Sequence, residues 1–439
     1  MMKSYSSYRN SNIEPIGHLP VEWRDSKIKY TGNVICGGTP STANDSLWGG
    51  EIPWLQSGKV QFKPIYLSDV DRFITENGLA NSSTKIVKGD SVLVAITGAT
   101  CSNIGYLTFD STVNQSIVGI EPSSKYSSWY IYYFLISQKH QILISQSGGA
   151  QGGVTKEEIK NLVIPKLPLR EQEHIASFLN SKTCKIDKLI QLSEYKIELL
   201  KEQRTALINQ CVTKGLNPNV EMKDSGVEWI GEIPKHWNIT KLKFIGDVVI
   251  GLSYKPENVV DEGEGTLVMR SSNVQNGKPS FSDNVYVNCE ISEKLTTKEG
   301  DILICSRNGS RRLIGKNCII TKEIAGMSFG VFMTIFRSEY WGFTHWILNS
   351  PIFKSQAGLF LTSTINQLTV STLQNFIIPF IAERAEQNQI VEYLNEQTHK
   401  IDSTIEKESQ RIELLKEYRR ALISEVVTGK IDVRDEVVV

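Results

Sequence analysis

The sequence predicts an α+β fold in which two strand-rich domains are each followed by a long helix, and the two helices pair as an antiparallel coiled coil with pseudo-twofold symmetry. Three observations support this prediction: a unit of about 215 residues occurs twice, a heptad stripe of apolar residues ends each copy, and short β-type runs fill the rest. The expected segments are a first domain at 1–165, a first helical spacer at 166–216, a second domain at 217–380 and a second helical spacer at 381–439.

The repeat shows as pairs of matching segments at a nearly constant offset. The first pair, IGHLPVEW and IGEIPKHW, begins at Ile16 and Ile230, an offset of 230 − 16 = 214 residues. NLVIP, from Asn161, returns as NFIIP, and IELLKE occurs unchanged from Ile197 and from Ile412. The copies are most alike in the helical segment and differ more in the domain before it, which indicates two versions of one task on a shared frame.

Length and composition are those of an ordinary globular protein with more than one domain. A chain of 439 residues can bury two or three separate cores, and its 40% hydrophobic and 22% charged residues give no sign of disorder. The first twelve residues are polar, and the longest apolar run, 129–136, is too short to cross a bilayer. We therefore expect a cytoplasmic protein.

Cysteine usage and net charge exclude two simple possibilities. The seven cysteines are widely spaced and form no pattern typical of a zinc finger, so we expect free thiols in a reducing compartment. Lysine and arginine together number 48, as do aspartate and glutamate, so no global positive field attracts a polyanion. This balance counts against tight DNA binding by the chain alone.

The two domains show short β-type runs, glycine-rich turns and one helix-like stretch each. The clearest strands are DSVLVAI at 90–96 and DILICS at 301–306, and the helical stretches are 127–144 and 340–356. This mixture predicts α+β domains with a strand-rich core.

Apolar residues in the two helical segments alternate four and three apart, which is the spacing of a coiled-coil seam. The seam residues are Ile186, Ile190, Ile197, Leu200 and Leu207 in the first segment and Ile401, Ile405, Ile412, Leu415 and Leu422 in the second. Polar residues interrupt both stripes at matching places, Ser193 against Glu408 and Arg204 against Arg419. A helix about 65 Å long, at about 1.5 Å per residue, needs a partner. The matching interruptions favour pairing with the other copy over two separate amphipathic helices that lie on their own domains.

The sequence lacks the motifs of catalysis and metal binding. NGSRRLIGKN at 308–317 departs from the glycine spacing of a phosphate loop, and LNPNV at 216–220 lacks the aromatic residue of an adenine methyltransferase motif. The six histidines show neither the H-E-x-x-H nor the H-x-E spacing of zinc enzymes. We therefore expect no catalytic residue and no metal ligand in this chain.

A basic loop in the second copy is the main candidate for contact with DNA. Its polar residues are Arg307, Asn308, Ser310, Arg311, Arg312 and Lys316. Arginine suits guanine, asparagine suits adenine and lysine suits phosphate, so this loop could both hold and read a duplex. The alternative is an ordinary solvated loop.

The first copy carries different residues at the matching places. Its loop has Thr97, Thr100, Ser102 and Asn103 and no charge, so the two loops are expected to read different bases. Upstream, Gln56, Ser57 and Lys59 take the places of Arg270, Ser271 and Asn273. Gln151 lies in a glycine-flanked loop that could approach a DNA backbone closely or merely turn the chain.

Five segments carry a resemblance to a known family. They are GGTPSTANDSLWGGEIPW (37–54), PLREQEHIASFLN (168–180), IELLKEQRTALI (197–208), SGVEWIGEIPKHW (225–237) and GDILICSRNGSRRLIGK (300–316). In this order they resemble the specificity subunits of type I restriction-modification enzymes, over nearly the whole chain. One departure is IAERAEQ at 381–387, where the family and the first copy have a proline-rich lead, so the start of the second spacer is left open.

The resemblance implies a DNA-reading subunit without catalysis of its own. The two domains would be target-recognition domains, each reading one half of a bipartite, asymmetric DNA site, and the helices would set the spacing and dock two modification subunits. Those partners would bind S-adenosylmethionine and methylate adenine, and two restriction subunits would add ATP- and Mg-dependent translocation and cleavage. No cofactor is expected on this chain, and DNA binding by the isolated chain should be weak and sensitive to salt.

Two other readings stay open at this point. One is an enzyme that combines recognition with methyl transfer or cleavage, against which the missing motifs argue. The other is a structural coiled-coil adaptor that never touches DNA, in which the basic loop is incidental.

Overall fold

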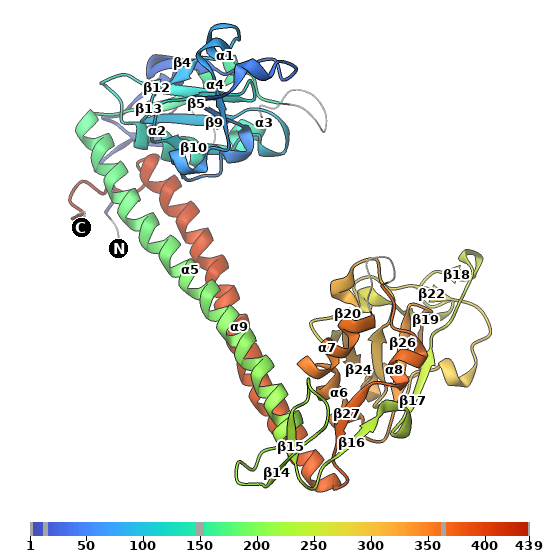
Figure 1. Ribbon diagram of the computed structural model, residues 1–439. Helices are drawn as coiled ribbons and strands as arrows, with labels where there is room; N and C mark the ends of the chain where they lie inside the picture. Colours follow the sequence, from blue (N-terminus) through green and yellow to red (C-terminus); the bar gives the residue numbers. More distant parts are fainter. Residues whose placement is uncertain (1–2, 12–15, 145–152, 361–365, 438–439) are drawn as a thin grey trace. The chain divides into compact units, whose positions relative to one another are not determined.

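The computed structural model describes residues 3–11, 16–144, 153–360 and 366–437. The chain divides into two compact units, the first made of residues 1–194 with 410–439 and the second of residues 195–409. Each unit holds one strand-rich domain and parts of both long helices, α5 (Leu169–Lys214) and α9 (Arg384–Val427), which pack together as the green and red ribbons of Figure 1.

Two sheets build the domain of the first unit. The larger has the strand order β4-β12-β9-β10-β6 and the smaller the order β7-β5-β11-β8. Among the described strand pairs of these two sheets, only β10 with β6 and β11 with β5 are parallel. The strands are β4 Gly32–Cys36, β5 Trp48–Leu55, β6 Pro64–Ile65, β7 Arg72–Ile74, β8 Ile86–Val87, β9 Ser91–Ala95, β10 Ile104–Leu107, β11 Ser111–Val113 and β12 Ile117–Pro122.

Shorter elements complete this domain. Two antiparallel strand pairs are β1 Tyr8–Asn10 with β2 His18–Pro20 and β3 Arg24–Lys27 with β13 Val163–Lys166. The helices are α1 Glu76–Ala80, α2 Ser128–Ser137, α3 Lys139–Ile144 and α4 Lys156–Asn161, and the 3-10 helices are η1 Ile28–Tyr30, η2 Asp45–Leu47, η3 Ser57–Lys59, η4 Leu67–Asp69 and η5 Gly98–Thr100.

The second unit repeats this plan with a four-stranded sheet of order β17-β26-β23-β24 and another of order β18-β22-β19-β25. Their strands are β17 Asp247–Ile250, β18 Val259–Val260, β19 Thr266–Met269, β22 Tyr286–Val287, β23 Ile302–Cys305, β24 Asn317–Ile319, β25 Ser328–Phe329 and β26 Met333–Arg337. The remaining strand pairs are β14 Met222–Asp224 with β15 Glu232–Pro234, β16 Asn238–Lys241 with β27 Ile377–Phe380, and β20 Val274–Gln275 with β21 Lys278–Pro279.

Helices of the second unit correspond to those of the first. They are α6 Trp341–Leu348, α7 Pro351–Phe360 and α8 Val370–Gln374, and the 3-10 helices are η6 Leu242–Phe244, η7 Pro256–Asn258, η8 Ser271–Asn273, η9 Glu293–Leu295, η10 Arg311–Leu313 and η11 Lys322–Ile324. The expected strands at 90–96 and 301–306 are confirmed as β9 and β23, whose apolar runs are wholly buried. The helical stretches at 127–144 and 340–356 are each broken in two, and Pro351 begins α7 where its missing N–H costs nothing.

The predicted coiled-coil seam is confirmed, because every seam residue is buried or half-buried between the helices and domains. Ion pairs between the helices show that they run antiparallel. In the first unit Asp187 pairs with Arg419 at 2.9 Å, and in the second unit Arg204 pairs with Asp402 at 2.9 Å. From the first ion pair to the second, the residue number rises along α5 and falls along α9, as in an antiparallel pair. Because the helices contact each other in both units, they are not two separate helices that lie on their own domains.

The polar interruptions of the stripe lie inside the seam. Ser193 and Glu408 are only 2% and 7% exposed, and Glu408 accepts a hydrogen bond from the Lys196 ammonium group at 2.6 Å. A buried carboxylate held by a lysine of the facing helix fixes one register, since sliding either helix would separate the two charges.

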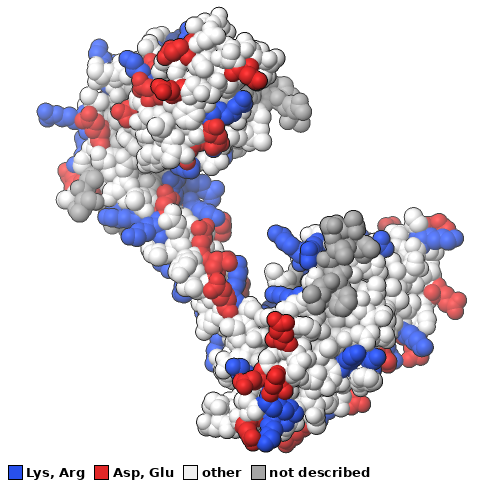
Figure 2. Space-filling model, in the orientation of Figure 1, with Lys and Arg blue, Asp and Glu red and all other residues white. Residues whose placement is uncertain are grey.

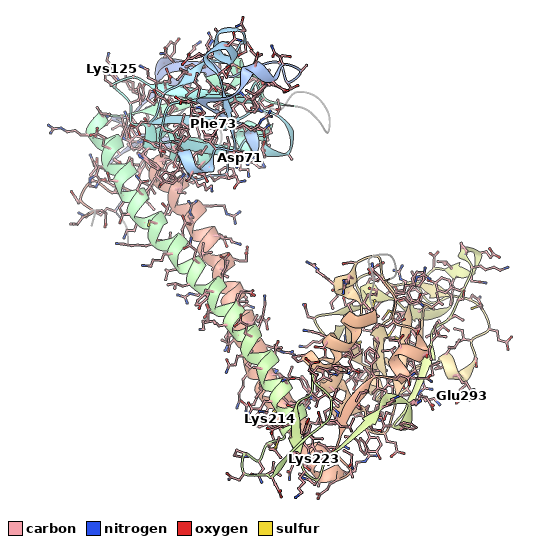
Figure 3. All side chains as sticks on the ribbon, in the orientation of Figure 1. Asp71, Phe73, Lys125, Lys214, Lys223 and Glu293 are labelled. Carbon is pink, nitrogen blue, oxygen red and sulfur yellow. The ribbon has the colours of Figure 1, made fainter. Side chains whose placement is uncertain are left out.

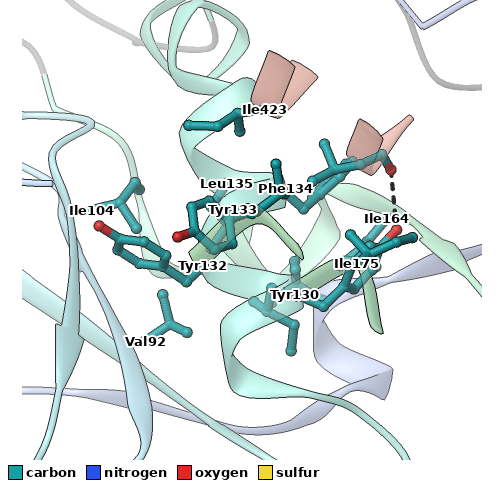
Figure 4. Packing of buried hydrophobic residues seen from close by; sticks show 14 of the residues in the cluster. Val92, Ile104, Tyr130, Tyr132, Tyr133, Phe134, Leu135, Ile164, Ile175 and Ile423 are labelled. Carbon is teal, nitrogen blue, oxygen red and sulfur yellow. Dashed lines mark hydrogen bonds between the residues drawn. The ribbon is translucent and has the colours of Figure 1, made fainter. Parts of the chain in front are cut away.

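The end of each long helix completes the core of the domain from the other copy. In the first unit Leu422, Ile423 and Val426 of α9 pack with α2, and the Tyr130 hydroxyl group donates to the carbonyl oxygen of Val427 at 3.3 Å (Figure 4). In the second unit Ile208, Cys211 and Val212 of α5 pack in the same way with Trp237 and Phe343. Neither domain core is complete without the other copy's helix.

One hydrogen bond repeats in both units and fixes the start of each helix. The indole N–H of Trp23 donates to the Glu171 carboxylate at 3.2 Å, and that of Trp237 donates to Glu386 at 3.0 Å. Glu386 belongs to the segment IAERAEQ, whose register the sequence left open. The structure therefore aligns the second spacer with the first, with α9 beginning at Arg384.

Both long helices end at a glycine in the left-handed region, Gly215 and Gly429, each with φ +70°. Residues 428–437 are not helical, so the second spacer is shorter than expected. The Asp432 N–H donates to the carbonyl oxygen of Lys3 at 2.8 Å, so this tail lies beside the N-terminal segment. Figure 3 shows Lys214 at the end of α5 and Lys223 in β14, the strand that follows.

Two further observations concern the whole of the described chain. All seven cysteines are free, as expected from their spacing. Among the residues that the structure describes, no helix has both the length and the apolar character needed to span a bilayer.

Candidate nucleic-acid interface

The two candidate loops leave the same place in the two domains. Each follows the central buried strand and closes on two backbone hydrogen bonds. In the first domain Ala95 N donates to Asn103 O at 2.9 Å and Ser102 N donates to Ala95 O at 2.8 Å. In the second domain Cys305 N donates to Lys316 O at 2.9 Å and Gly315 N donates to Cys305 O at 2.8 Å. The first residue after each strand is bonded in the same way to a segment further along the chain. Ile96 N donates to Ser116 O at 2.9 Å, and Ser306 N donates to Phe332 O at 3.0 Å. Thr97 and Ser116 of the first domain therefore stand where the second domain has Arg307 and Phe332.

A cavity of about 1300 Å³ opens beside the loop of the second domain. Five of the predicted residues line it, namely Arg270, Ser271, Arg307, Asn308 and Lys316. The structure thus brings together residues from two segments about 35 positions apart in the chain, as a recognition surface requires.

Arg307 and Phe332 form a cation–π pair on this cavity. The Arg307 guanidinium group lies 5.1 Å from the centre of the Phe332 ring, and the ring is 52% exposed. The Arg307 N–H also donates to the carbonyl oxygen of Phe332 at 3.1 Å, which holds the two backbones together. A planar guanidinium group on an aromatic face has little freedom to rotate.

Other lining side chains are held by specific partners. Arg270 pairs with Asp283 at 2.8 Å, and its buried Nε has no hydrogen-bond partner among the described residues. The Asn308 amide donates to the Ser271 hydroxyl group at 3.0 Å, and the Lys316 ammonium group donates to a backbone carbonyl at 2.9 Å. These contacts orient the polar groups, and the lysine keeps two donors for a ligand.

Ser310, Arg311 and Arg312 lie outside the cavity lining, on and before η10. All three are exposed. Arg311 donates to the carbonyl oxygen of Gly358 at 3.4 Å. Their exposure outside the cavity suits contacts with phosphate more than base reading.

In the first domain the surface is uncharged except for one lysine. Gln56 and Thr97 are exposed, and Ser57 is half-buried. The Lys59 ammonium group pairs with Asp71, labelled in Figure 3, at 2.5 Å. This domain therefore offers hydroxyl and amide groups where the second offers arginine.

Two predicted residues are buried and cannot reach DNA in this structure. Ser102, 0% exposed with φ +69°, takes the loop-closing place of Gly315, φ +83°. Asn273 is also 0% exposed, and its amide donates to the carbonyl oxygens of Ser280 and Asp283. The Asn273 amide therefore serves the loop's own backbone. The buried Ser102 hydroxyl group has no hydrogen-bond partner among the described residues.

Three more predicted residues of the first domain have limited or undescribed roles. The Asn103 amide donates to the carbonyl oxygen of Val60 at 2.9 Å, and the Thr100 hydroxyl group to that of Thr97 at 3.5 Å. Gln151 lies outside the described residues.

Sequence reasoning missed Phe332, together with Tyr254, Gln275 and Gln367, which also line the cavity. Phe332 stands in the run FGVFMTIF, whose apolar character is typical of a buried strand. Only the comparison with the first copy, which has a serine at the matching place, gives a signal for it.

The chemistry of this surface is binding rather than catalysis. It supplies hydrogen-bond donors, amides and one exposed ring, which suit base edges in a groove. The described residues include no group of three or more His, Cys, Asp or Glu side chains that could hold a metal ion. Figure 2 shows acidic and basic side chains interspersed over the visible face, in keeping with the zero net charge.

Comparisons with known proteins found a family model and similar proteins. Residues 20–202 match the family model of the type I restriction modification DNA specificity domain. The specificity subunit of the type I restriction enzyme MjaVIII from Methanocaldococcus jannaschii is 27% identical over 98% of this chain and 98% of its own length.

Two solved structures share the fold. One, from work on complex assembly and conformational transition of the type I R-M system, has a TM-score of 0.74 at 16% identity, covering 94% of this chain and 99% of the other. The HsdS subunit from Thermoanaerobacter tengcongensis has a TM-score of 0.53 at 15% identity, covering 94% and 98%. At such identities the likeness establishes the fold alone. Residues 20–202 match the DNA specificity domain of type I restriction-modification systems, and over nearly its whole length the chain is similar to a specificity subunit of a type I restriction enzyme.

Proposed function

We propose that this chain gives a type I restriction-modification complex its sequence specificity, each domain reading one half of a bipartite, asymmetric DNA site. The observation that carries the proposal is the repeated loop frame with unlike side chains. Thr97 and Ser116 in one domain occupy the places of Arg307 and Phe332 in the other. Two readers that hold the same position and differ in chemistry select different half-sites.

The paired helices would set the spacing between the half-sites. α5 and α9 each run unbroken through residues of both units, and in each unit a buried seam and an ion pair join them. Seven residues added to both helices at facing positions, after Leu200 and before Ile405, keep the heptad register. The insert lengthens each helix by about 10 Å, so we expect a longer gap in the methylated site, by up to about three base pairs.

Two modification subunits would dock on surfaces that the chain presents twice. A large apolar residue is exposed at the same place in each copy, Tyr30 at 66% and Phe244 at 71%, and again on the helices, Leu199 at 45% and Leu414 at 65%. One residue of each pair falls in each unit. Two identical partners need two such surfaces, and exposed apolar side chains of this size mark interfaces.

The partners, and not this chain, would bring the cofactors. Modification subunits would carry S-adenosylmethionine, and restriction subunits would carry ATP and Mg. The cytoplasm, where the genome lies, would be the place of the complex. Without its partners the chain has no net positive charge with which to hold a polyanion, so we expect weak, salt-labile DNA binding.

Mapping methylated adenines tests the reading function. The chain is co-expressed with its modification subunit, and the genome is sequenced by a method that detects the modified base. We expect one split, asymmetric motif. A stable complex that methylates nothing would support the structural adaptor, and so would full function after Arg307, Arg311 and Arg312 are all replaced by alanine. Methylation by the chain alone would support the fused enzyme.

The docking surfaces have a separate test. Native mass spectrometry counts the modification subunits held by Tyr30→Ala, by Phe244→Ala and by the double variant. Each single change should weaken the binding of one subunit, and the double change should weaken both. Val21→Ala is the control, because Val21 is 49% exposed and the second copy has Lys235 at its place. Equal loss in the control would contradict the assignment.

A further inference from the structure

The Arg307 and Phe332 pair has a geometry that selects particular bases. The loop is locked to the strand bearing Phe332 by three hydrogen bonds to that residue's carbonyl oxygen, from Ser306 N, Arg307 N and the Ser306 hydroxyl group, at 3.0, 3.1 and 3.1 Å. The ring is half exposed and carries the guanidinium group on its face. The backbone of Arg307 is therefore held in place before any ligand arrives, with its guanidinium group over the ring.

A guanidinium fork placed over a ring suits guanine more than phosphate. Guanine presents O6 and N7 in the major groove at the spacing of two parallel N–H donors, and binding them depends on orientation. Phosphate tolerates many approaches and is served by free arginines such as Arg312, which is exposed and lies outside the cavity lining. The amides of Asn308 and Gln367 line the same cavity, as expected for a base-reading surface.

The exposed Phe332 ring can contact a base beside the one that the Arg307 guanidinium group binds. Stacked bases are about 3.4 Å apart, so a ring in contact with a guanidinium group that reads one base pair lies level with the next. The apolar group on the major-groove edge of a base is the C5 methyl of thymine, and phenylalanine is among the side chains that contact it.

We propose that the second domain reads a guanine with a neighbouring thymine in the major groove. Arg307 donates two hydrogen bonds to O6 and N7 of the guanine, and Phe332 contacts the thymine methyl group. This rests on the proposed function and adds the base step that one half-site contains. The first domain, with Thr97 and Ser116 at these places, reads neither group in this way.

Base analogues test the contacts one atom at a time. The complex with modification subunits is titrated, at fixed salt, with duplexes carrying its methylated site, in which deoxyuracil replaces the thymine or 7-deazaguanine replaces the guanine. Removal of the methyl should weaken binding about fourfold, the factor for one buried methyl group. Loss of N7 should weaken it about tenfold, as for one lost contact to a base edge.

The two test variants introduce the residues that the first domain has at the matching places, Thr97 and Ser116. The second domain should therefore fold with them. Phe332→Ser should abolish the effect of deoxyuracil and leave that of 7-deazaguanine, and Arg307→Thr should abolish the effect of 7-deazaguanine. Arg312→Ala should weaken all duplexes equally, as a phosphate contact does.

Two results separate this inference from the function on which it rests. A split motif whose second-domain half lacks guanine would overturn the inference and leave the specificity role intact. Equal sensitivity to deoxyuracil in Phe332→Ser and in the parent would also overturn it. A complex that reads no split motif would remove the proposed function itself.

Discussion

A buried ion pair under the recognition loop offers the sharpest test of how the second domain is held. Asp301, 1% exposed, accepts two hydrogen bonds from Arg337, both at 2.7 Å, and a third from the Lys298 N–H at 2.7 Å. It precedes β23, and the other end of that strand leads to Arg307. Asp301→Ala leaves the arginine without its anion.

The expected loss follows from the burial of the pair. Removing one member of a buried pair costs about 3–5 kcal/mol. The Arg337 side chain is 26% exposed and regains some water, so we expect about 3 kcal/mol. Asp301→Ala with Arg337→Met removes both charges and keeps the arginine stem's apolar packing, and should recover most of the loss.

Hydrogen exchange followed by mass spectrometry measures this locally. A loss of about 3 kcal/mol should speed exchange in β23 and β26 more than about a hundredfold where exchange occurs through unfolding of the unit. Strands β9 and β12 of the first unit serve as the internal control and should keep their rates. Unchanged exchange in β23, or equal acceleration in both units, would refute the reasoning.

The remaining predictions concern the helix ends and pH. Leu422, 2% exposed in the core of the first unit, should cost about 2–5 kcal/mol when changed to alanine, whereas Leu414, 65% exposed on the same helix, should cost less than about 0.5 kcal/mol, as measured by urea denaturation. Burial lowers the pKa of His345 to about 4 from an ordinary 6.5. The unfolded chain therefore binds a proton that the folded chain does not, and the second unit should lose stability as the pH falls from 6.5 towards 4. His345→Gln should flatten that dependence in urea midpoints measured across this range, and an unchanged slope would exclude His345 as its source.

The sequence predicted the features that depend on periodicity. The 3-4 spacing of residues such as Ile197 and Ile412 has one structural solution, a buried seam, and the apolar runs of β9 and β23 could only be inner strands. The repeat located both loops. Both copies keep the same buried strand before the loop, so the two loops align even where their side chains differ.

Side-chain roles inside the loops could not be predicted in the same way. Ser102 and Asn273 have the chemistry of base-reading residues, yet both are buried, and Asn273 uses its amide on the chain's own backbone. Phe332 has the chemistry of a core residue and is exposed. Which role applies depends on a left-handed φ at Ser102 and on the strand end at Met333, and neither is encoded by residue type alone.

The shared frame also means that the loops should be exchangeable. Both close on the same pair of backbone hydrogen bonds and carry a left-handed residue at the same point, Ser102 or Gly315. Residues 97–103 placed between Ser306 and Asn317 should therefore leave hydrogen exchange in β23 and β24 near its parent rate. Methylation mapping should then show a changed second half-site and the original first one. An unchanged motif would mean that other segments of the domain read the bases, because the frame and the partners are the same in both proteins.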